Sequence, residues 1–155
     1  MHRVLAPLVR SMGVDLCLDV VRPGYVPGGA GIIEMTVVPR RQGLDALVLS
    51  AAGRVCDVHG IALSSHLAAQ RVSERIASTC ETRIRGEGMA CAVDRMEDDT
   101  AVHAGACLAI WAKGSTGSWF GTTTMAIPDL EDSPIKPEAY RQINHVARQL
   151  IHAFD

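Results

Sequence analysis

The sequence lacks the features that mark several large classes of protein. Its longest apolar runs, such as residues 106–112, are far shorter than the about 18 residues that cross a bilayer, and its start lacks the apolar stretch of a signal peptide. Aromatic residues make up only 4% and the net charge is −2, which leaves few rings for stacking bases and no strongly basic patch. With 48% hydrophobic residues, the chain is too apolar for disorder. We therefore expect a soluble globular protein of the cytoplasm.

The cysteines form neither a zinc motif nor a disulfide framework. Their number is odd and no pair has the C-x₂-C spacing. Each lies among apolar neighbours, where a free cysteine behaves as a small hydrophobic residue. We predict reduced, buried thiols at Cys17, Cys56, Cys80, Cys91 and Cys107.

The first 40 residues contain three expected elements and little material for a core. Apolar residues at helical spacing predict a helix over residues 4–12 that ends at Gly13. Strands are predicted at 16–21 and 32–38, on either side of a loop with four glycines at 23–31. A unit of about 39 residues rarely buries enough surface to fold alone. We expect it to pack on the rest of the chain or on another polypeptide.

The remaining residues predict an α+β domain. Residues 40–44 are a plausible junction, and strands are expected at 47–49 and 54–63. Ser64 or Ser65 is a good N-cap for a helix that runs to about residue 80. A strand at 82–93, a loop at 97–99 and a hairpin of 106–112 with 119–126 follow. A helix from Pro137 to the end of the sequence completes the order β-β-α-β-β-β-α.

No catalytic, cofactor-binding or metal-ligating residue follows from the motifs. The segment 113–116 fails the phosphate-loop pattern, because Lys113 precedes the glycine and strands flank it on both sides. His145 and His152 are two helical turns apart, and His59 and His66 lack a well-spaced third ligand. The sequence gives no nucleophile elbow around residues 64–66.

Arginine supplies all the cations except Lys113 and Lys136. Arginine binds phosphate in a bidentate manner. Two arginines one helical turn apart, with two more close behind, suggest a small RNA-binding patch; a solvated helix face explains the same arrangement. The four residues are Arg71, Arg75, Arg83 and Arg85.

Three stretches, in the same order along the chain, resemble the RNA 3′-terminal-phosphate cyclase family. The first covers residues 4–13 and 21–31, and its Tyr25-Val26-Pro27-Gly28-Gly29 is the most specific part. The second, residues 58–63 with 68–77, is similar to a strand and a helix of the family. The third, residues 105–117, resembles its Gly-x-x-x-x-hydrophobic-x-Ala-x-x-Ser-Thr-Gly stretch.

The resemblance implies a fold and a reaction. Members of the family use ATP to adenylylate a histidine, transfer AMP to an RNA 3′-phosphate, and close a 2′,3′-cyclic phosphate; ATP and a divalent metal are implied. Their fold combines βα repeats with a small insert domain. Residues 1–40 resemble part of a core repeat and residues 41–155 the α+β insert domain.

The departures from the family bear on activity. The family's nucleotide-binding loops lie upstream of residue 1 and its adenylylated histidine downstream of residue 155. Ala30 replaces a loop glycine, and residues 129–137 are acidic and interrupted by proline. No catalytic residue is carried over to this chain.

Three hypotheses follow. In the first, the chain is a fragment or split subunit that needs partner chains, the missing cyclase halves, and is inactive alone. In the second, it is a non-catalytic RNA- or protein-binding module of the cyclase-like ribosome-assembly type. In the third, the apolar face of residues 1–40 pairs with a second copy.

Overall fold

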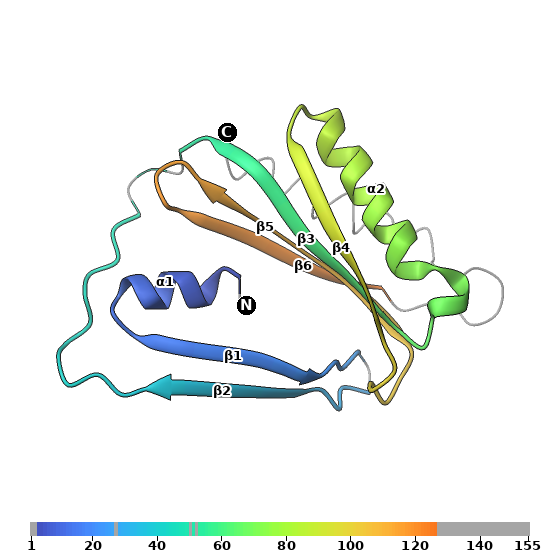
Figure 1. Ribbon diagram of the computed structural model, residues 1–155, viewed down its shortest axis with the longest axis horizontal. Coiled ribbons are helices and arrows are strands. Elements are labelled where there is room, and N and C mark those ends of the chain that lie inside the picture. The colour runs from blue at the N-terminus through green and yellow to red at the C-terminus, as the bar shows by residue number, and fades with distance from the viewer. Residues whose placement is uncertain (1–2, 27, 50, 52, 127–155) are drawn as a thin grey trace.

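A computed structural model describes residues 3–26, 28–49, 51 and 53–126 (Figure 1). Its helices and strands give an α+β fold, as predicted. In chain order the elements are α1 (Leu5–Ser11), β1 (Asp15–Arg22), β2 (Ile32–Val38), β3 (Val55–Ser65), the 3₁₀ turn η1 (Ala68–Gln70), α2 (Val72–Gly86), β4 (Ala90–Asp98), β5 (Gly105–Gly114) and β6 (Trp119–Ala126).

Strands β3 to β6 form one sheet in the order β4-β3-β5-β6. β3 and β4 are parallel and α2 connects them, whereas β5 runs antiparallel to both β3 and β6. α2 packs on one face of the sheet (Figure 1). Alternate residues of β5 point toward it, so Leu108, Ile110 and Ala112 are buried against Ile76 and Ile84 of the helix. This layer of helix on sheet is the core of the described chain.

Strands β1 and β2 form a separate two-stranded antiparallel sheet, which we call the ribbon. α1 lies beside β1 on the side of the ribbon that faces the four-stranded sheet (Figure 1). Leu16 and Leu18 of β1 are buried, as is Ala6 of α1. Every residue of β2 is exposed. The ribbon therefore has no complete core of its own, in agreement with the expectation from its length.

Several sequence predictions are confirmed. The first helix, the strands at β1, β2 and β3, and the β5–β6 hairpin all occur close to their expected bounds. Cys80 and Cys91 are buried free thiols. The predicted C-terminal helix lies outside the described residues, as does the side chain of Cys56.

Other predictions are wrong. Residues 47–49 belong to no strand. α2 continues to Gly86 because Ile84 extends its buried stripe, so the strand expected from residue 82 begins at Ala90. The loop expected at 97–99 starts two residues later, since β4 includes Asp98. Cys17 is exposed, and Cys107 is only partly buried.

Candidate functional site

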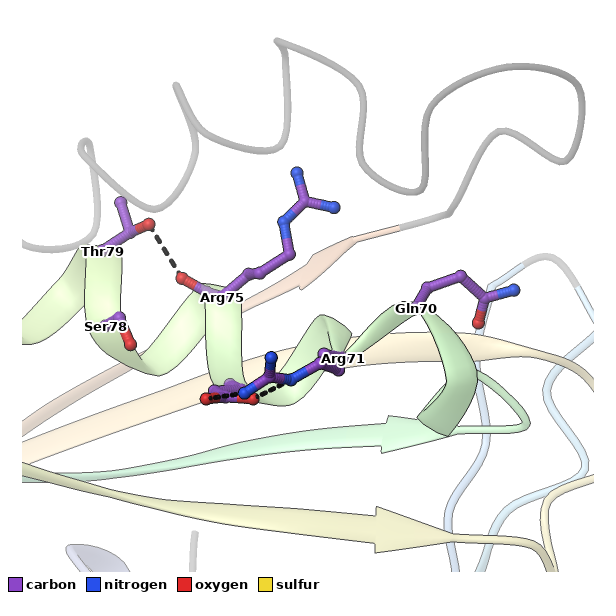
Figure 2. A pocket seen from close by; sticks show the side chains of 6 residues that line it. Gln70, Arg71, Arg75, Ser78 and Thr79 are labelled. Carbon is purple, nitrogen blue, oxygen red and sulfur yellow. Dashed lines mark hydrogen bonds and ion pairs between the residues drawn. The ribbon is translucent and has the colours of Figure 1, made fainter.

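Two of the four predicted arginines share a shallow pocket on α2. Arg71 and Arg75 line a cavity of about 430 Å³ together with Gln70, Glu74, Ser78 and Thr79 (Figure 2). Arg71 precedes the helix in the left-handed region, with φ of 52°, and its guanidinium pairs with the Glu74 carboxylate. The side chain of Arg75 extends away from the helix. An RNA phosphate at this pocket would compete with Glu74 for Arg71.

The other two arginines do not join this pocket. Arg83 lies 3.7 Å from Glu87. Arg85 donates a hydrogen bond of 2.8 Å to the Cys91 carbonyl and lies 3.6 Å from Glu81. Ten residues separate Arg75 from Arg85 on the helix, which turns them to different sides. RNA binding by Arg71, Arg75, Arg83 and Arg85 stays a prediction.

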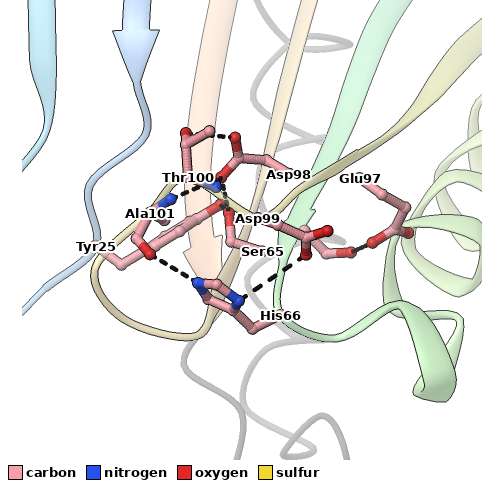
Figure 3. Close-up of polar contacts among 9 residues, drawn as sticks. Tyr25, Ser65, His66, Glu97, Asp98, Asp99, Thr100 and Ala101 are labelled. Atoms are coloured by element: carbon pink, nitrogen blue, oxygen red, sulfur yellow. Dashed lines mark hydrogen bonds and ion pairs between the residues drawn. The ribbon is translucent and has the colours of Figure 1, made fainter.

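A polar junction lies where the parallel strands β3 and β4 end (Figure 3). The register places Ser64 beside Glu97 and Ser65 beside Asp98. Both hydroxyls donate to the neighbouring carboxylate, at 2.6 Å and 3.0 Å. The prediction that Ser64 or Ser65 caps the following helix is wrong. Both serines are buried at the end of the strand, and the 3₁₀ turn separates them from α2.

Tyr25 connects the junction to the first region. Its hydroxyl lies 2.8 Å from Oγ of Ser65, forty residues along the chain, and its ring is buried. Burial raises the pKa of Tyr25 to about 12. The ring packs over Gly105, where a Cβ would lie only 2.3 Å from it. Tyr25 of the loop motif therefore attaches the first region to the sheet.

The loop after β4 is held by Asp98 and His66. Asp98 accepts hydrogen bonds from the backbone N–H groups of Thr100 and Ala101 and from the Thr100 hydroxyl. Burial acts to raise the pKa of Asp98, but these bonds and the one from Ser65 outweigh it and lower the pKa. His66 Nε2 lies 2.6 Å from the Ala101 carbonyl oxygen. These contacts fix the junction in place, and none of them activates a nucleophile.

Two kinds of feature were searched for among the described residues, a metal-binding group and a membrane-spanning helix. They contain no group of three or more His, Cys, Asp or Glu side chains that could hold a metal ion. His59 points to the open face of the sheet, whereas His66 lies at the strand end. None of the described helices has the length and apolar character needed to span a membrane.

A second group of side chains was not predicted from the sequence. Trp111 and Trp119, with His59 and Lys113, surround a pocket on the sheet face opposite α2. The low aromatic content argued against such a site, and only the pairing of β5 with β6 brings the two tryptophans together. Helical or strand periodicity within one segment does not predict which strands pair.

Comparison with known proteins connects the chain to one family. Residues 50–154 match the sequence profile described as RNA 3′-terminal phosphate cyclase (RTC), insert domain. An RNA 3′-terminal phosphate cyclase of Methanothermobacter thermautotrophicus is 28% identical over 145 residues, which cover 92% of this chain and 41% of that protein. An RNA 3′-terminal phosphate cyclase of Methylococcus capsulatus is 32% identical over 93 residues, 60% of this chain and 26% of that protein. The chain thus spans about two fifths or less of the length of these relatives.

Proposed function

The chain belongs to the RNA 3′-terminal phosphate cyclase family, and from that premise we propose that it supplies the insert domain of a cyclase-type enzyme and acts together with the rest of such an enzyme. The completed enzyme converts an RNA 3′-phosphate to a 2′,3′-cyclic phosphate with ATP. The histidine that is adenylylated, the ATP site and any divalent metal belong to the rest of that enzyme. Alone, the chain is inactive.

The observation that carries this proposal is the half-covered apolar face of the ribbon. The register aligns three pairs of apolar residues on one face: Leu16 with Val37, Leu18 with Met35, and Val20 with Ile33. The opposite face carries polar pairs such as Asp19 with Glu34. The first face is therefore apolar in every pair, whereas the opposite face mixes polar and apolar side chains, so the first face is the one suited to burial.

Only the part of this apolar face along the first half of β1 is covered. α1 packs beside β1, where Leu16 and Leu18 are buried. On β2, Ile33 is 58% and Met35 63% exposed, and Val37 is exposed as well. A two-stranded ribbon is marginal in water unless a further element covers it. The uncovered strip runs along β2, parallel to α1, and suits one more apolar helix or strand.

The same strip supports a second candidate, self-association. Two copies could cover each other's β2 through a symmetric contact of Ile33, Met35 and Val37. The two candidates differ in their concentration dependence, because pairing of two copies strengthens with concentration, whereas the rest of a cyclase-type enzyme would already cover the strip. Sedimentation of the isolated chain as a monomer at high concentration would count against self-association.

The experiment is a chimera. The residues of this chain replace the matching 145-residue segment of the Methanothermobacter relative, and ATP-dependent cyclisation of a 3′-phosphate RNA is measured. We expect turnover by the chimera and none by the isolated chain. Met35→Glu, on the apolar face, should abolish turnover in the chimera. Thr36→Glu, on the opposite face of the same strand, is the matched control and should retain it. Turnover by the pure isolated chain would overturn the proposal.

A further inference from the structure

Both tryptophans of the chain lie on the sheet face opposite α2. Leu108, Ile110 and Ala112 of β5 point toward α2, so the alternating residues Trp111 and Lys113 point the other way. The β5–β6 register sets Trp119 directly beside Lys113. The β3–β5 register sets His59 beside Trp111. Adjacent strands thus present a continuous group of rings and cations.

The rings and cations are in mutual contact. The rings of His59 and Trp111 are stacked, with centroids 6.4 Å apart and an angle of 23° between their planes. Nζ of Lys113 lies 5.6 Å from the ring centroid of Trp119, and the guanidinium carbon of Arg3 lies 5.6 Å from that of Trp111. These are cation–π distances. They place positive charge directly beside both indole rings.

These side chains surround a pocket of about 460 Å³ that is open to solvent. Its walls are Asp57, His59, Trp111, Lys113, Gly114, Ser115 and Trp119. His59, Lys113 and Asp57 are exposed, and both tryptophans are half-buried. The volume falls in the range of small-ligand sites, about 300–1,000 Å³. The pocket thus combines aromatic rings with one ammonium group, that of Lys113, and one carboxylate, that of Asp57.

We propose that this pocket binds one unpaired nucleobase of single-stranded RNA, an inference that rests on the proposed function. An indole ring stacks on any base, and a sheet that presents aromatic side chains is a common platform for single-stranded RNA. Lys113 and Arg3 supply positive charge for the adjoining phosphates. Asp57 can only accept hydrogen bonds when ionised, so it favours a base with an exocyclic amino group. Adenine and cytosine should therefore bind better than uracil.

Tryptophan fluorescence reports on this pocket alone, because the chain has two tryptophans and both line it. The full chain is titrated with short oligo(A), oligo(C) and oligo(U) RNAs that carry a 3′-phosphate, and with a duplex of equal length. We expect saturable quenching by oligo(A) and oligo(C), weaker quenching by oligo(U), and little by the duplex.

Substitutions assign the binding to the pocket. Trp119→Ala should weaken oligo(A) binding about tenfold or more, measured by anisotropy of a labelled RNA. Trp119→Phe keeps a stacking ring and should retain most of the affinity, which also controls for misfolding of the alanine variant. Lys113→Gln should reduce the slope of log affinity against log salt by about one. Asp57→Asn should reduce the ratio of the affinity for oligo(A) to the affinity for oligo(U).

The matched control for these substitutions is a double variant on α2, which covers the opposite face of the sheet. A variant with both Arg71→Ala and Arg75→Ala changes the α2 pocket and should leave the tryptophan quenching unchanged. Loss of RNA binding in this variant, with unaltered affinity in Trp119→Ala, would overturn the inference and place the RNA on α2. Absence of quenching by any RNA would also overturn it. The cyclase proposal is decided separately, by turnover of the chimera.

Discussion

The ribbon and the four-stranded sheet are built from strands of similar apolar content but differ in what covers them. In β5, every second side chain is buried beneath α2. In β2, the side chains with the same alternation remain exposed, whereas α1 packs on β1. Alternation along a strand therefore identifies the face that is meant for burial, but it does not identify the element that covers this face. For the sheet it is α2; for β2 we assign it to the rest of the cyclase-type enzyme.

The largest loss of stability is expected for an isoleucine of the core, compared with an isoleucine of the exposed strand β2. Ile110→Ala empties a buried position under α2 and should lower the free energy of unfolding by about 3 kcal/mol. Ile33→Ala removes an exposed side chain from β2 and should change it by about 0.5 kcal/mol or less. Urea unfolding followed by circular dichroism measures both. Equal costs for the two variants would mean that β2 is covered within this chain.

The next effect concerns the contact between the two regions. Gly105→Ala puts a methyl group where the Tyr25 ring lies, so the ring must leave its site, at a cost of about 2 kcal/mol. Limited proteolysis should then cut within residues 15–38 while the four-stranded sheet survives. Gly86→Ala is the control, since a Cβ there meets nothing within 4 Å and the change favours the helix. Unchanged proteolysis in Gly105→Ala would show that Tyr25 does not hold the regions together.

A smaller effect on stability depends on pH and concerns the contact between α2 and β4 of the four-stranded sheet. Glu81 of α2 accepts two hydrogen bonds of 3.0 Å from Arg95 and one of 3.0 Å from the Val93 N–H on β4. The bonds from Arg95 hold the pKa of Glu81 below its ordinary value, although burial opposes this. The stabilisation is therefore complete above the unfolded pKa of about 4.3 and is lost as the pH falls through the folded value.

Glu81→Gln tests this linkage. The variant should be less stable than the parent by about 1.5 kcal/mol at pH 7, measured by urea unfolding. Because protonation removes the same charge from the parent, the difference should shrink steadily below about pH 4. A difference that stays constant from pH 7 to pH 3 would exclude the ionised carboxylate as its cause.

The smallest effect isolates one hydroxyl. Tyr25→Phe removes the hydrogen bond to Ser65 at a cost of about 1 kcal/mol. The pKa of Tyr25 is raised to about 12, so the folded chain retains this proton above the ordinary value of about 10 and loses stability as the pH rises from there. Tyrosinate absorbance should show one group that titrates near pH 12 in the parent and is missing in Tyr25→Phe. Titration of Tyr25 near pH 10 would place its ring in water.

The sequence predicted elements well wherever a local pattern defines them. The buried stripe of Ile76 and Cys80 gave α2, and alternation gave β2 and β5. The end of α2 was placed near residue 80 because residues 82–93 were interpreted as a strand, although Ile84 continues the buried stripe of the helix.

Contacts between distant residues could not be predicted in the same way. A serine before a helical stripe is typical of an N-cap, yet Ser65 bonds to Tyr25, forty residues earlier. Trp119 meets Lys113 only through the register of a hairpin. Helical spacing did pair Arg71 with Arg75, whereas Arg85 was expected on a strand and lies on another side of α2. Local periodicity determines which residues share one face of a helix or strand. The candidate site depends instead on which of these faces pack against each other.

Amide hydrogen exchange shows whether the rest of a cyclase-type enzyme completes the ribbon. It is measured on the isolated chain at two concentrations and on the cyclase chimera. We predict that the amides of β1 and β2 exchange far faster than those of β3 and β5 in the isolated chain at both concentrations, and that they become as protected as β5 in the chimera. Ribbon amides that are as protected as β5 in the isolated, dilute chain, or that gain no protection in the chimera, would contradict the account.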